Sequence, residues 1–464
     1  MRHWTKLIAG TALVVSFALL VMPVPDGFSS EIMRAAALLI FAVGFWATGA
    51  LPVHLTAIAF FLLAVLIGAA PPLTIFAGFA STAFWLVFGG LIVGIAVERT
   101  GLGVRLADAL LRLIGGSYLR IVAGVALVGL VLAFLMPSTM GRVVILVPIM
   151  AALADRLGYE PGSRGRHGIV MATALGTFMP AATILPANVA NMVLTGAAET
   201  IYGVRIHYLE YLWLHFPVLG LLKWVVLVFL IAAIYGSGPQ SVERAPRSSG
   251  EVPPLSRDER ILAVILAAAL LLWALDYWHG ISPAWVALGA GLLCLLPGIA
   301  LVPLEDFERR MNLASLVYVA GILGLSAVVD RSGLGKVLAD GLVGLTGLAP
   351  GEDARNFATL AGLSTFLGLI TTIGGVPGIL TPLAAGVAEA SGLRLDSVLM
   401  TQVLGFSTVI LPYQLPPLVV AMQLGGVPMA MGARLTLALA AVTLIVLLPL
   451  DYGWWRLLGY VGPG

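Results

Sequence analysis

Long apolar segments separated by short polar ones make up most of this chain, and their lengths predict helices that cross a membrane. A helix needs roughly 17 to 25 apolar residues to span a bilayer. Uninterrupted segments of about this length occupy residues 7–23, 31–50, 53–71, 83–98, 213–235, 261–276, 283–302, 313–329 and 435–450. Four further apolar stretches, residues 118–156, 167–201, 354–391 and 395–424, are interrupted by polar residues or proline. The pattern predicts an all-α polytopic membrane protein with about 11 transmembrane helices.

The interruption from Met136 to Arg142 is the most informative feature of this pattern. Pro137 ends the apolar helix before it, and Ser138 is a typical N-cap for the next helix. The N–H groups of residues 139–141 then point off a helix end that attracts anions. In hydrocarbon such a backbone break must be buried in protein or line a cavity. Arg142 adds a charge one turn inside this end, which indicates a functional site.

The second half of the chain repeats the first. Ten of eighteen residues are identical between 98–115 and 330–347, and a second break, Thr371–Pro377, again separates two apolar runs. The positive-inside rule places the N-terminus and 16 basic residues in the cytoplasm and seven outside. The two copies then face opposite ways, which predicts two inverted repeats with two re-entrant hairpins and two broken helices, and a site at the midplane.

These features divide the chain into six parts. We expect N-terminal scaffold helices at 1–82, a first inverted repeat with a scaffold helix at 83–236 (hairpin 118–156, broken helix 167–201), a cytoplasmic linker at 237–260, scaffold helices at 261–311, a second inverted repeat at 312–429 (hairpin 354–391, broken helix 395–424) and a C-terminal helix at 430–464. An amphipathic stretch at 99–115 is expected to lie in the membrane interface.

Composition supports the membrane assignment and excludes several classes of protein. Only 10% of the residues are charged and 60% are hydrophobic, whereas a soluble protein carries about a quarter charged residues. The net charge of +2 predicts no nucleic-acid partner. The sequence has no Walker motif, no HExxH motif and no Cys/His cluster, so we do not expect an enzyme. The expected location is the cell inner (plasma) membrane, with a retained first helix and a cytoplasmic N-terminus.

The chain resembles the divalent anion/sodium symporter family of dicarboxylate, citrate and sulfate carriers. The resemblance rests on Gly-Leu-x-x-Arg-Leu-Ala after Glu98, on the two hairpins and on the two interrupted helices, and it covers nearly the whole chain from about residue 30. It implies a homodimer surrounded by lipid, a scaffold domain, an elevator-like transport domain and a small anionic substrate, such as a dicarboxylate.

The tip motifs depart from those of the family. Each family tip reads Ser-Asn-Thr ten residues before a proline, and here the tips read Ser138-Thr139-Met140 and Thr372-Ile373-Gly374. The family's Gly-Thr-Pro-Pro-Asn stands as residues 187–191 and 414–418 with only part of the pattern retained. In the family the tip asparagines serve sodium and carboxylate together. Their loss predicts a secondary active transporter with sodium coupling reduced or absent.

The candidate substrate-binding residues come from the two tips and the two broken helices. They are Ser138, Thr139, Arg142, Asn188, Asn191, Thr372, Gly374, Gln414 and Pro416. Arg142 offers a bidentate fork suited to carboxylate, sulfonate or sulfate. The oxygens of Ser138, Thr139 and Ala187 form a candidate sodium site, and Na⁺ is the only cofactor considered. In another interpretation, the charge of Arg142 replaces a bound sodium ion.

Several alternatives stay open at this point. The polar residues also have structural interpretations, since Arg142 can pair with a carbonyl, Ser138 and Thr139 can cap a helix, and buried amides can tie helices together. An anion channel and the membrane subunit of a tripartite carrier are alternative functions. No carboxylate is expected in the core to carry a proton, so exchange or facilitated transport is favoured. Lys223 is expected to reach the interface by snorkelling.

Overall fold

The computed structural model describes residues 2–111, 117–236 and 254–461, and all regular elements in these ranges are helical. In the first half they are α1 (Arg2–Val21), α2 (Ser30–Thr48), α3 (Val53–Leu66), α4 (Pro72–Ile75), α5 (Ala77–Ala80), α6 (Thr82–Thr100), α7 (Leu102–Leu111), α8 (Tyr118–Leu135), α9 (Thr139–Arg156), α10 (Arg164–Ala181), η1 (Leu185–Ala187), α11 (Val189–Tyr202), α12 (Tyr208–His215), η2 (Phe216–Leu222) and α13 (Lys223–Tyr235).

The second half has a similar succession of elements. They are α14 (Arg257–Ala274), α15 (Asp276–His279), α16 (Pro283–Leu295), α17 (Leu304–Arg310), α18 (Leu313–Arg331), α19 (Leu334–Thr346), α20 (Asp353–Ile370), η3 (Ile373–Gly375), α21 (Val376–Leu380), η4 (Thr381–Leu383), α22 (Ala384–Ser391), α23 (Leu395–Phe406), η5 (Pro412–Gln414), α24 (Pro416–Gly425), α25 (Met429–Val442), η6 (Thr443–Leu447) and α26 (Leu448–Leu457).

Seven helical segments in the described ranges are long and apolar enough to cross a membrane. They are α2, α6, α8, the continuous helix Tyr208–Tyr235, α18, Ile373–Ser391 and Met429–Leu457. Shorter apolar helices, among them α3, α16, α23 and α24, accompany them. The prediction of an all-α polytopic membrane protein is therefore confirmed. The span predicted at 53–71 is too long, because α3 ends at Leu66 and Gly68 adopts a left-handed conformation (φ +61°) before α4 begins.

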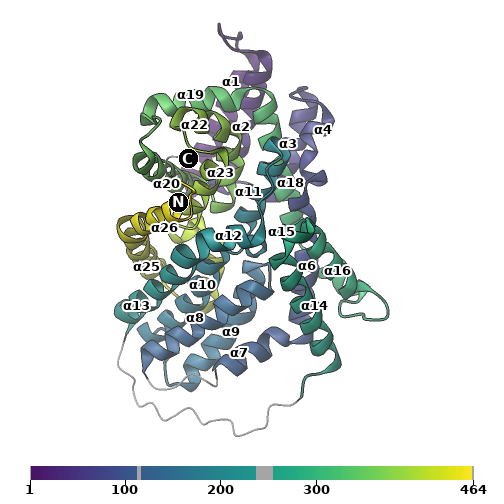
Figure 1. The fold of residues 1–464 in the computed structure, drawn as a ribbon, viewed down its shortest axis with the longest axis vertical. Helices are drawn as coiled ribbons and strands as arrows, with labels where there is room; N and C mark the ends of the chain where they lie inside the picture. Colours follow the sequence, from purple (N-terminus) through teal and green to yellow (C-terminus); the bar gives the residue numbers. More distant parts are fainter. Residues whose placement is uncertain (1, 112–116, 237–253, 462–464) are drawn as a thin grey trace.

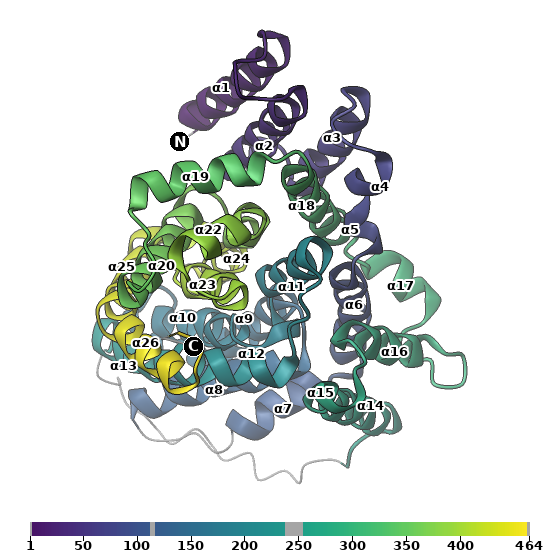
Figure 2. The same ribbon diagram turned by 45° about the horizontal axis from the view of Figure 1, so that its top comes forward.

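The helices form two sides with a central group between them. In Figures 1 and 2, α6, α14 and α16 lie on the right, α25 and α26 lie on the left, and α10, α11 and α12 lie between. On the right side, α6 packs tightly against α16. A Cβ added at Gly89 would lie 2.4 Å from the carbonyl oxygen of Ala287, so only glycine permits this approach. In the centre, α10 packs against α8, α9 and α13.

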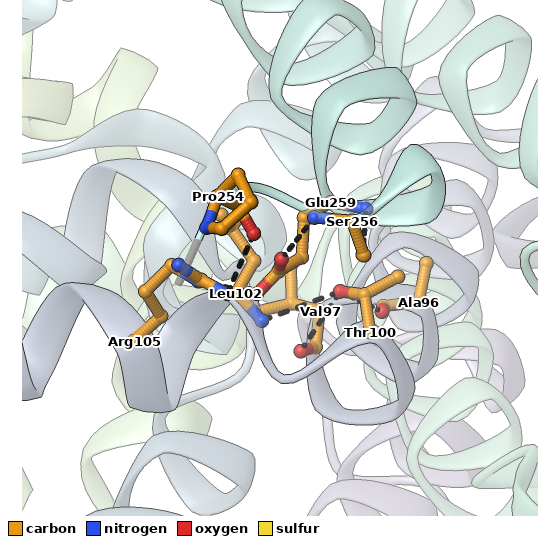
Figure 3. Close-up of polar contacts among 8 residues, drawn as sticks. All are labelled: Ala96, Val97, Thr100, Leu102, Arg105, Pro254, Ser256 and Glu259. Atoms are coloured by element: carbon orange, nitrogen blue, oxygen red, sulfur yellow. Dashed lines mark hydrogen bonds and ion pairs between the residues drawn. The ribbon is translucent and has the colours of Figure 1, made fainter. Parts of the chain in front are cut away.

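The predicted amphipathic stretch 99–115 contains α7, while residues 112–116 lie outside the described residues. Figure 3 shows Arg105 of α7 reaching the start of α14, where its Nε donates to Glu259 Oε1 at 2.6 Å. Glu259 also forms a capping box with Ser256. The Arg105 guanidinium, helped by the Ser256 N–H, holds the pKa of Glu259 below its usual value of 4.5. This ion pair ties α7 to the last residues of the predicted linker 237–260, whose residues 237–253 lie outside the described residues.

Two long helices each contain a π-helical segment, in which one extra residue widens a turn. In Tyr208–Tyr235 it is η2, and in Met429–Leu457 it is η6. Both segments pack against α26 or continue into it. π-Helical turns often occur at functional sites, and Lys223 directly follows η2.

Candidate functional site

A cavity of about 110 Å³ lies where the first helix break meets the first broken helix. Its lining comes from α6, the α8–α9 break, the start of α11, the start of α18 and the end of η5. The lining residues are Val87, Gly90, Leu91, Pro137, Ser138, Thr139, Met140, Asn188, Val189, Met192, Asn312, Ser315 and Leu415. Because five separate parts of the chain meet here, the cavity depends on the tertiary fold as a whole.

The wall formed by the α8–α9 break has the local structure that the sequence predicts. The helix α8 ends at Leu135 before Pro137, and Ser138 caps α9 by accepting a hydrogen bond from Gly141 N at 3.1 Å. The N–H groups of Thr139 and Met140, in the first turn of α9, have no partner within the helix. This helix end therefore presents two N–H donors and the positive end of the helix dipole at the cavity.

The side chain of Arg142 points away from the cavity and is completely buried. Its Nε donates to Thr177 Oγ1 at 2.7 Å. The Nη atoms donate to Thr139 Oγ1 at 3.0 Å, to Ala187 O at 3.3 Å and to the carbonyl oxygen of Met136. None of the ion pairs among the described residues includes Arg142. Its positive charge is therefore surrounded by neutral oxygen atoms, and most of its donors are occupied.

The hydrogen bonds of Arg142 involve two of the three candidate sodium ligands, Thr139 and Ala187. Thr139 Oγ1 donates to Ala187 O at 3.2 Å, and both oxygens accept from the Nη2 atom of Arg142. Ser138 lies beside them but directs its oxygen to the helix backbone. Two of the three candidate sodium ligands therefore converge on one point, and the guanidinium of Arg142 occupies it.

The two asparagines of the first broken helix have different surroundings. Asn191 is fully buried, and its Nδ2 donates to Ala181 O and Ile184 O, both at 2.9 Å. These carbonyls are released where α10 ends, so Asn191 stabilises the break. Asn188 lines the cavity and caps α11 through its Oδ1, while its Nδ2 has no hydrogen-bond partner among the described residues. Of the two, Asn188 offers a free donor to a bound molecule.

The second helix break lies close to the first but outside the cavity lining. Thr372 Oγ1 lies 3.4 Å from Tyr318 Oη, and a Cβ added at Gly374 would lie 4.0 Å from Val189 Cγ1. Val189 is a cavity residue, so the second break borders the cavity through α11. Gln414 is fully buried and accepts from Ile410 N and Leu411 N, both at 2.7 Å. It stabilises its own break, and Pro416 follows the cavity residue Leu415.

The structure thus sorts the nine predicted site residues into three groups. Ser138, Thr139 and Asn188 line the cavity; Thr372, Gly374 and Pro416 border it; Arg142, Asn191 and Gln414 lie behind it and hold broken backbone. The sequence analysis missed Asn312 and Ser315, which line the cavity at the start of α18. A polar residue at the start of an unbroken span is an ordinary helix cap, so the sequence alone carried no signal for them.

Two expectations about charged residues are wrong. Lys223 does not reach the interface: it is 1% exposed, and its Nζ donates to Ser407 O at 2.7 Å, at the end of α23. The core also contains a carboxylate, because Asp451 of α26 is fully buried. The predicted last span stopped at residue 450, since an acidic residue ends a hydropathy window. The helix in fact continues to Leu457 and packs against η2 and α20.

Comparison with known proteins gives consistent matches along the chain. The family model for the sodium:sulfate symporter transmembrane region matches residues 1–461. A membrane protein of Cupriavidus necator is 27% identical over 99% of this chain and 93% of its own. A citrate/succinate antiporter of Escherichia coli is 26% identical over 55% of each chain. The solved structure of the Alcanivorax borkumensis YdaH transporter superposes with a TM-score of 0.55 at 17% identity, over 99% of this chain and 98% of its own, which indicates a shared fold.

Proposed function

Since the chain belongs to the family of the sodium:sulfate symporters, we propose that it is a secondary active transporter of a small anion, with sodium coupling reduced or absent. Membership of this family makes it a membrane-embedded transporter rather than an enzyme. The finer proposal rests on one observation, the enclosure of Arg142 by neutral oxygens.

An anion suits the donors that face the cavity. The free N–H groups of Thr139 and Met140, the positive end of the α9 dipole and the Nδ2 of Asn188 all favour negative charge. We assign direct substrate contact to Ser138, Thr139 and Asn188. A dicarboxylate is the favoured class, because the name of the Escherichia coli relative gives citrate and succinate as its substrates.

Arg142 supports a transporter that does not need sodium at this site. A sodium site at a broken helix uses freed backbone carbonyls and side-chain oxygens. Here such oxygens, from Met136, Thr139 and Ala187, already bind a guanidinium. A second cation among the same oxygens would meet a unit positive charge within about 4 Å. The fixed cation holds the two broken segments together, as a bound ion would, and keeps the site electrically positive.

The remaining parts of the proposal follow the family plan. We assign residues 83–211 and 312–429 to two inverted repeats whose hairpins enter from opposite faces, and we place the N-terminus in the cytoplasm of a cell with an inner membrane. Alternating access would then arise as the domain carrying both breaks moves past the scaffold of a homodimer.

Uptake into proteoliposomes tests this proposal. We expect labelled succinate to enter vesicles preloaded with unlabelled succinate, at rates that are equal in sodium and potassium buffers. Asn188→Ala should weaken this uptake, whereas Ser332→Ala, at the opposite end of α18 from the cavity, should not. Steep sodium dependence would refute the sodium-free mechanism. Single-channel currents would instead indicate a channel, and a requirement for a soluble binding protein would indicate a tripartite carrier.

A further inference from the structure

A second group of buried polar side chains lies away from the cavity, beside the two π-helical segments. Lys223 is the first residue after η2, and Asp451 lies in the first turn after η6. The two side chains come from different helices that pack together, since η2, which ends one residue before Lys223, packs against α26, which carries Asp451. His215, fully buried on α12, stands on the same side, since its ring lies 5.6 Å from that of Trp455 on α26.

Lys223 connects this group to the second broken helix. Its ammonium donates to the carbonyl oxygen of Ser407, the residue that ends α23 just before the backbone breaks. The broken segment that begins at Ser407 continues through Gln414 to Leu415, which lines the cavity. A change in charge at Lys223 therefore acts on the end of the backbone segment that borders the proposed anion site.

Asp451 lacks the contacts that a purely structural carboxylate would have. It is fully buried, neither of its oxygens has a hydrogen-bond partner among the described residues, and no cation lies within ion-pair distance of it there. The donor that faces it is the Trp455 indole, one turn along the same helix, whose Nε1 has no other hydrogen-bond partner among the described residues. A buried carboxylate with so few donors is costly as an anion, and taking up a proton relieves that cost.

The elements around α26 offer few other groups to carry the charge. They are η2, η6, α20 and α12. The π segments contain no titratable residue, and the charged residues of α20, Asp353 and Arg355, lie in its first turn with partial or full exposure. The titratable side chains nearby are Lys223, His215, Tyr211, Tyr452, Tyr460, Glu210 and Arg456. Glu210 and Arg456 are exposed, whereas Lys223 and Asp451 are buried side chains of opposite charge.

We propose that Asp451, with Lys223 as its positive neighbour, binds and releases a proton, and that this proton is coupled to transport of the anion. A proton from water joins one carboxylate oxygen of Asp451, and the neutral acid later returns it to water. With Asp451 ionised the pair has no net charge. With Asp451 protonated, the charge of Lys223 stands uncompensated at the Ser407 carbonyl, beside the segment that borders the cavity.

This coupling has a defined sign, and it rests on the proposed function of anion transport. Protonation adds one net positive charge beside the broken segment that borders the cavity, so the anion binds more tightly at low pH. Linkage requires that anion binding in turn promotes proton uptake by Asp451. Coupled sites typically change each other's affinity by about 5- to 150-fold, and we expect a change of this size in the apparent affinity for succinate between acidic and alkaline buffer.

Infrared difference spectroscopy of the purified full-length protein tests proton binding without any substrate. Stepping the buffer from alkaline to acidic pH should produce the carbonyl stretch of one protonated, water-shielded carboxylic acid. This band should disappear in Asp451→Asn and persist in Asp353→Asn, which removes an accessible carboxylate. Lys223→Met should keep Asp451 protonated at both pH values, so the band should not respond to pH. A band that is absent from the wild type, or unchanged in Asp451→Asn, overturns the proposal.

Transport measurements separate this inference from the proposed function. Wild-type succinate uptake should respond to pH, and the response should be lost in the double variant Lys223→Met/Asp451→Asn. This variant removes both buried charges together, so it provides a test even if the single variants fail to fold. Succinate exchange that is independent of pH in the wild type refutes the proton coupling and leaves the anion transporter standing. A pH-dependent carboxyl band in a protein that moves no anion supports proton binding and refutes the proposed function.

Discussion

Replacing Arg142 by serine should create a sodium site. The substitution removes the guanidinium and leaves the oxygens of Met136, Thr139 and Ala187 around the vacated position. In the wild type, a sodium ion about 4 Å from the guanidinium would be repelled by about 4 kcal/mol at an effective dielectric constant of about 20. Removing that charge should therefore raise sodium affinity by roughly a thousandfold.

The variant should be unstable without sodium and regain stability with it. Each acceptor that loses its donor costs about 1–3 kcal/mol when it stays buried. Sodium at a hundredfold excess over its Kd should restore about 2.7 kcal/mol. Thermal unfolding in sodium chloride and in choline chloride at equal ionic strength measures the difference. Arg142→Lys, which retains the charge, is the matched control and should show no sodium effect.

Two results would refute this reasoning. If Arg142→Ser unfolds at the same temperature in both salts, the oxygens around Arg142 do not form a cation site. If the wild type is stabilised by sodium as strongly as the variant, sodium binds elsewhere and Arg142 does not replace it.

Three further predictions concern packing, the broken helices and the α7–α14 ion pair. Gly89→Ala should lower the free energy of unfolding by about 1–3 kcal/mol, because its Cβ would meet the Ala287 carbonyl. The control Gly94→Ala has open space around the added atom and should show no loss of stability in thermal unfolding. Equal losses in the two variants would contradict the packing argument. Asn191→Ala should cost about 1–3 kcal/mol, because it removes two buried hydrogen bonds from Nδ2, although Ala181 O and Ile184 O each keep one backbone donor. Asn188→Ala should cost about 1 kcal/mol and lose most of the stabilisation by succinate. If Asn191→Ala instead lost the succinate effect and Asn188→Ala kept it, the assigned roles would be wrong. Glu259→Gln should be less stable than the wild type near neutral pH. The difference in the free energy of unfolding should vanish as the pH falls through the lowered pKa of Glu259, below 4.5, because a protonated Glu259 no longer pairs with Arg105 in the folded wild type. A difference that persists in acid would refute the ion-pair contribution.

The helix breaks could be predicted from the sequence because their causes are local. Pro137 removes a backbone donor and Ser138 caps the next helix within three residues, so both ends of the break are encoded where they occur. Asn188 caps the helix that begins beside it, a role that the sequence analysis did not assign to it. Local capping chemistry needs no knowledge of the neighbouring helices.

The direction of Arg142 and the burial of Asp451 could not be predicted in this way. Two acceptors of Arg142, Thr177 and Ala187, lie 35 and 45 residues further along the chain. Asp451 and Lys223 are buried because other parts of the fold cover the helices Tyr208–Tyr235 and Met429–Leu457 at these two positions. Hydropathy describes a segment, whereas these positions depend on which segments surround it.

The enclosure of Arg142 also constrains how the protein is made. An arginine at the centre of a membrane helix costs about 2.5–3.5 kcal/mol on insertion scales. At a synthesis rate of about 5–20 residues per second, Thr177 and Ala187 are made roughly 2–9 seconds after Arg142. During that interval α8 and α9 hold only two of the four acceptors, Met136 O and Thr139 Oγ1. We therefore expect α8 and α9 to reach their final packing only after α10 and η1 have been made.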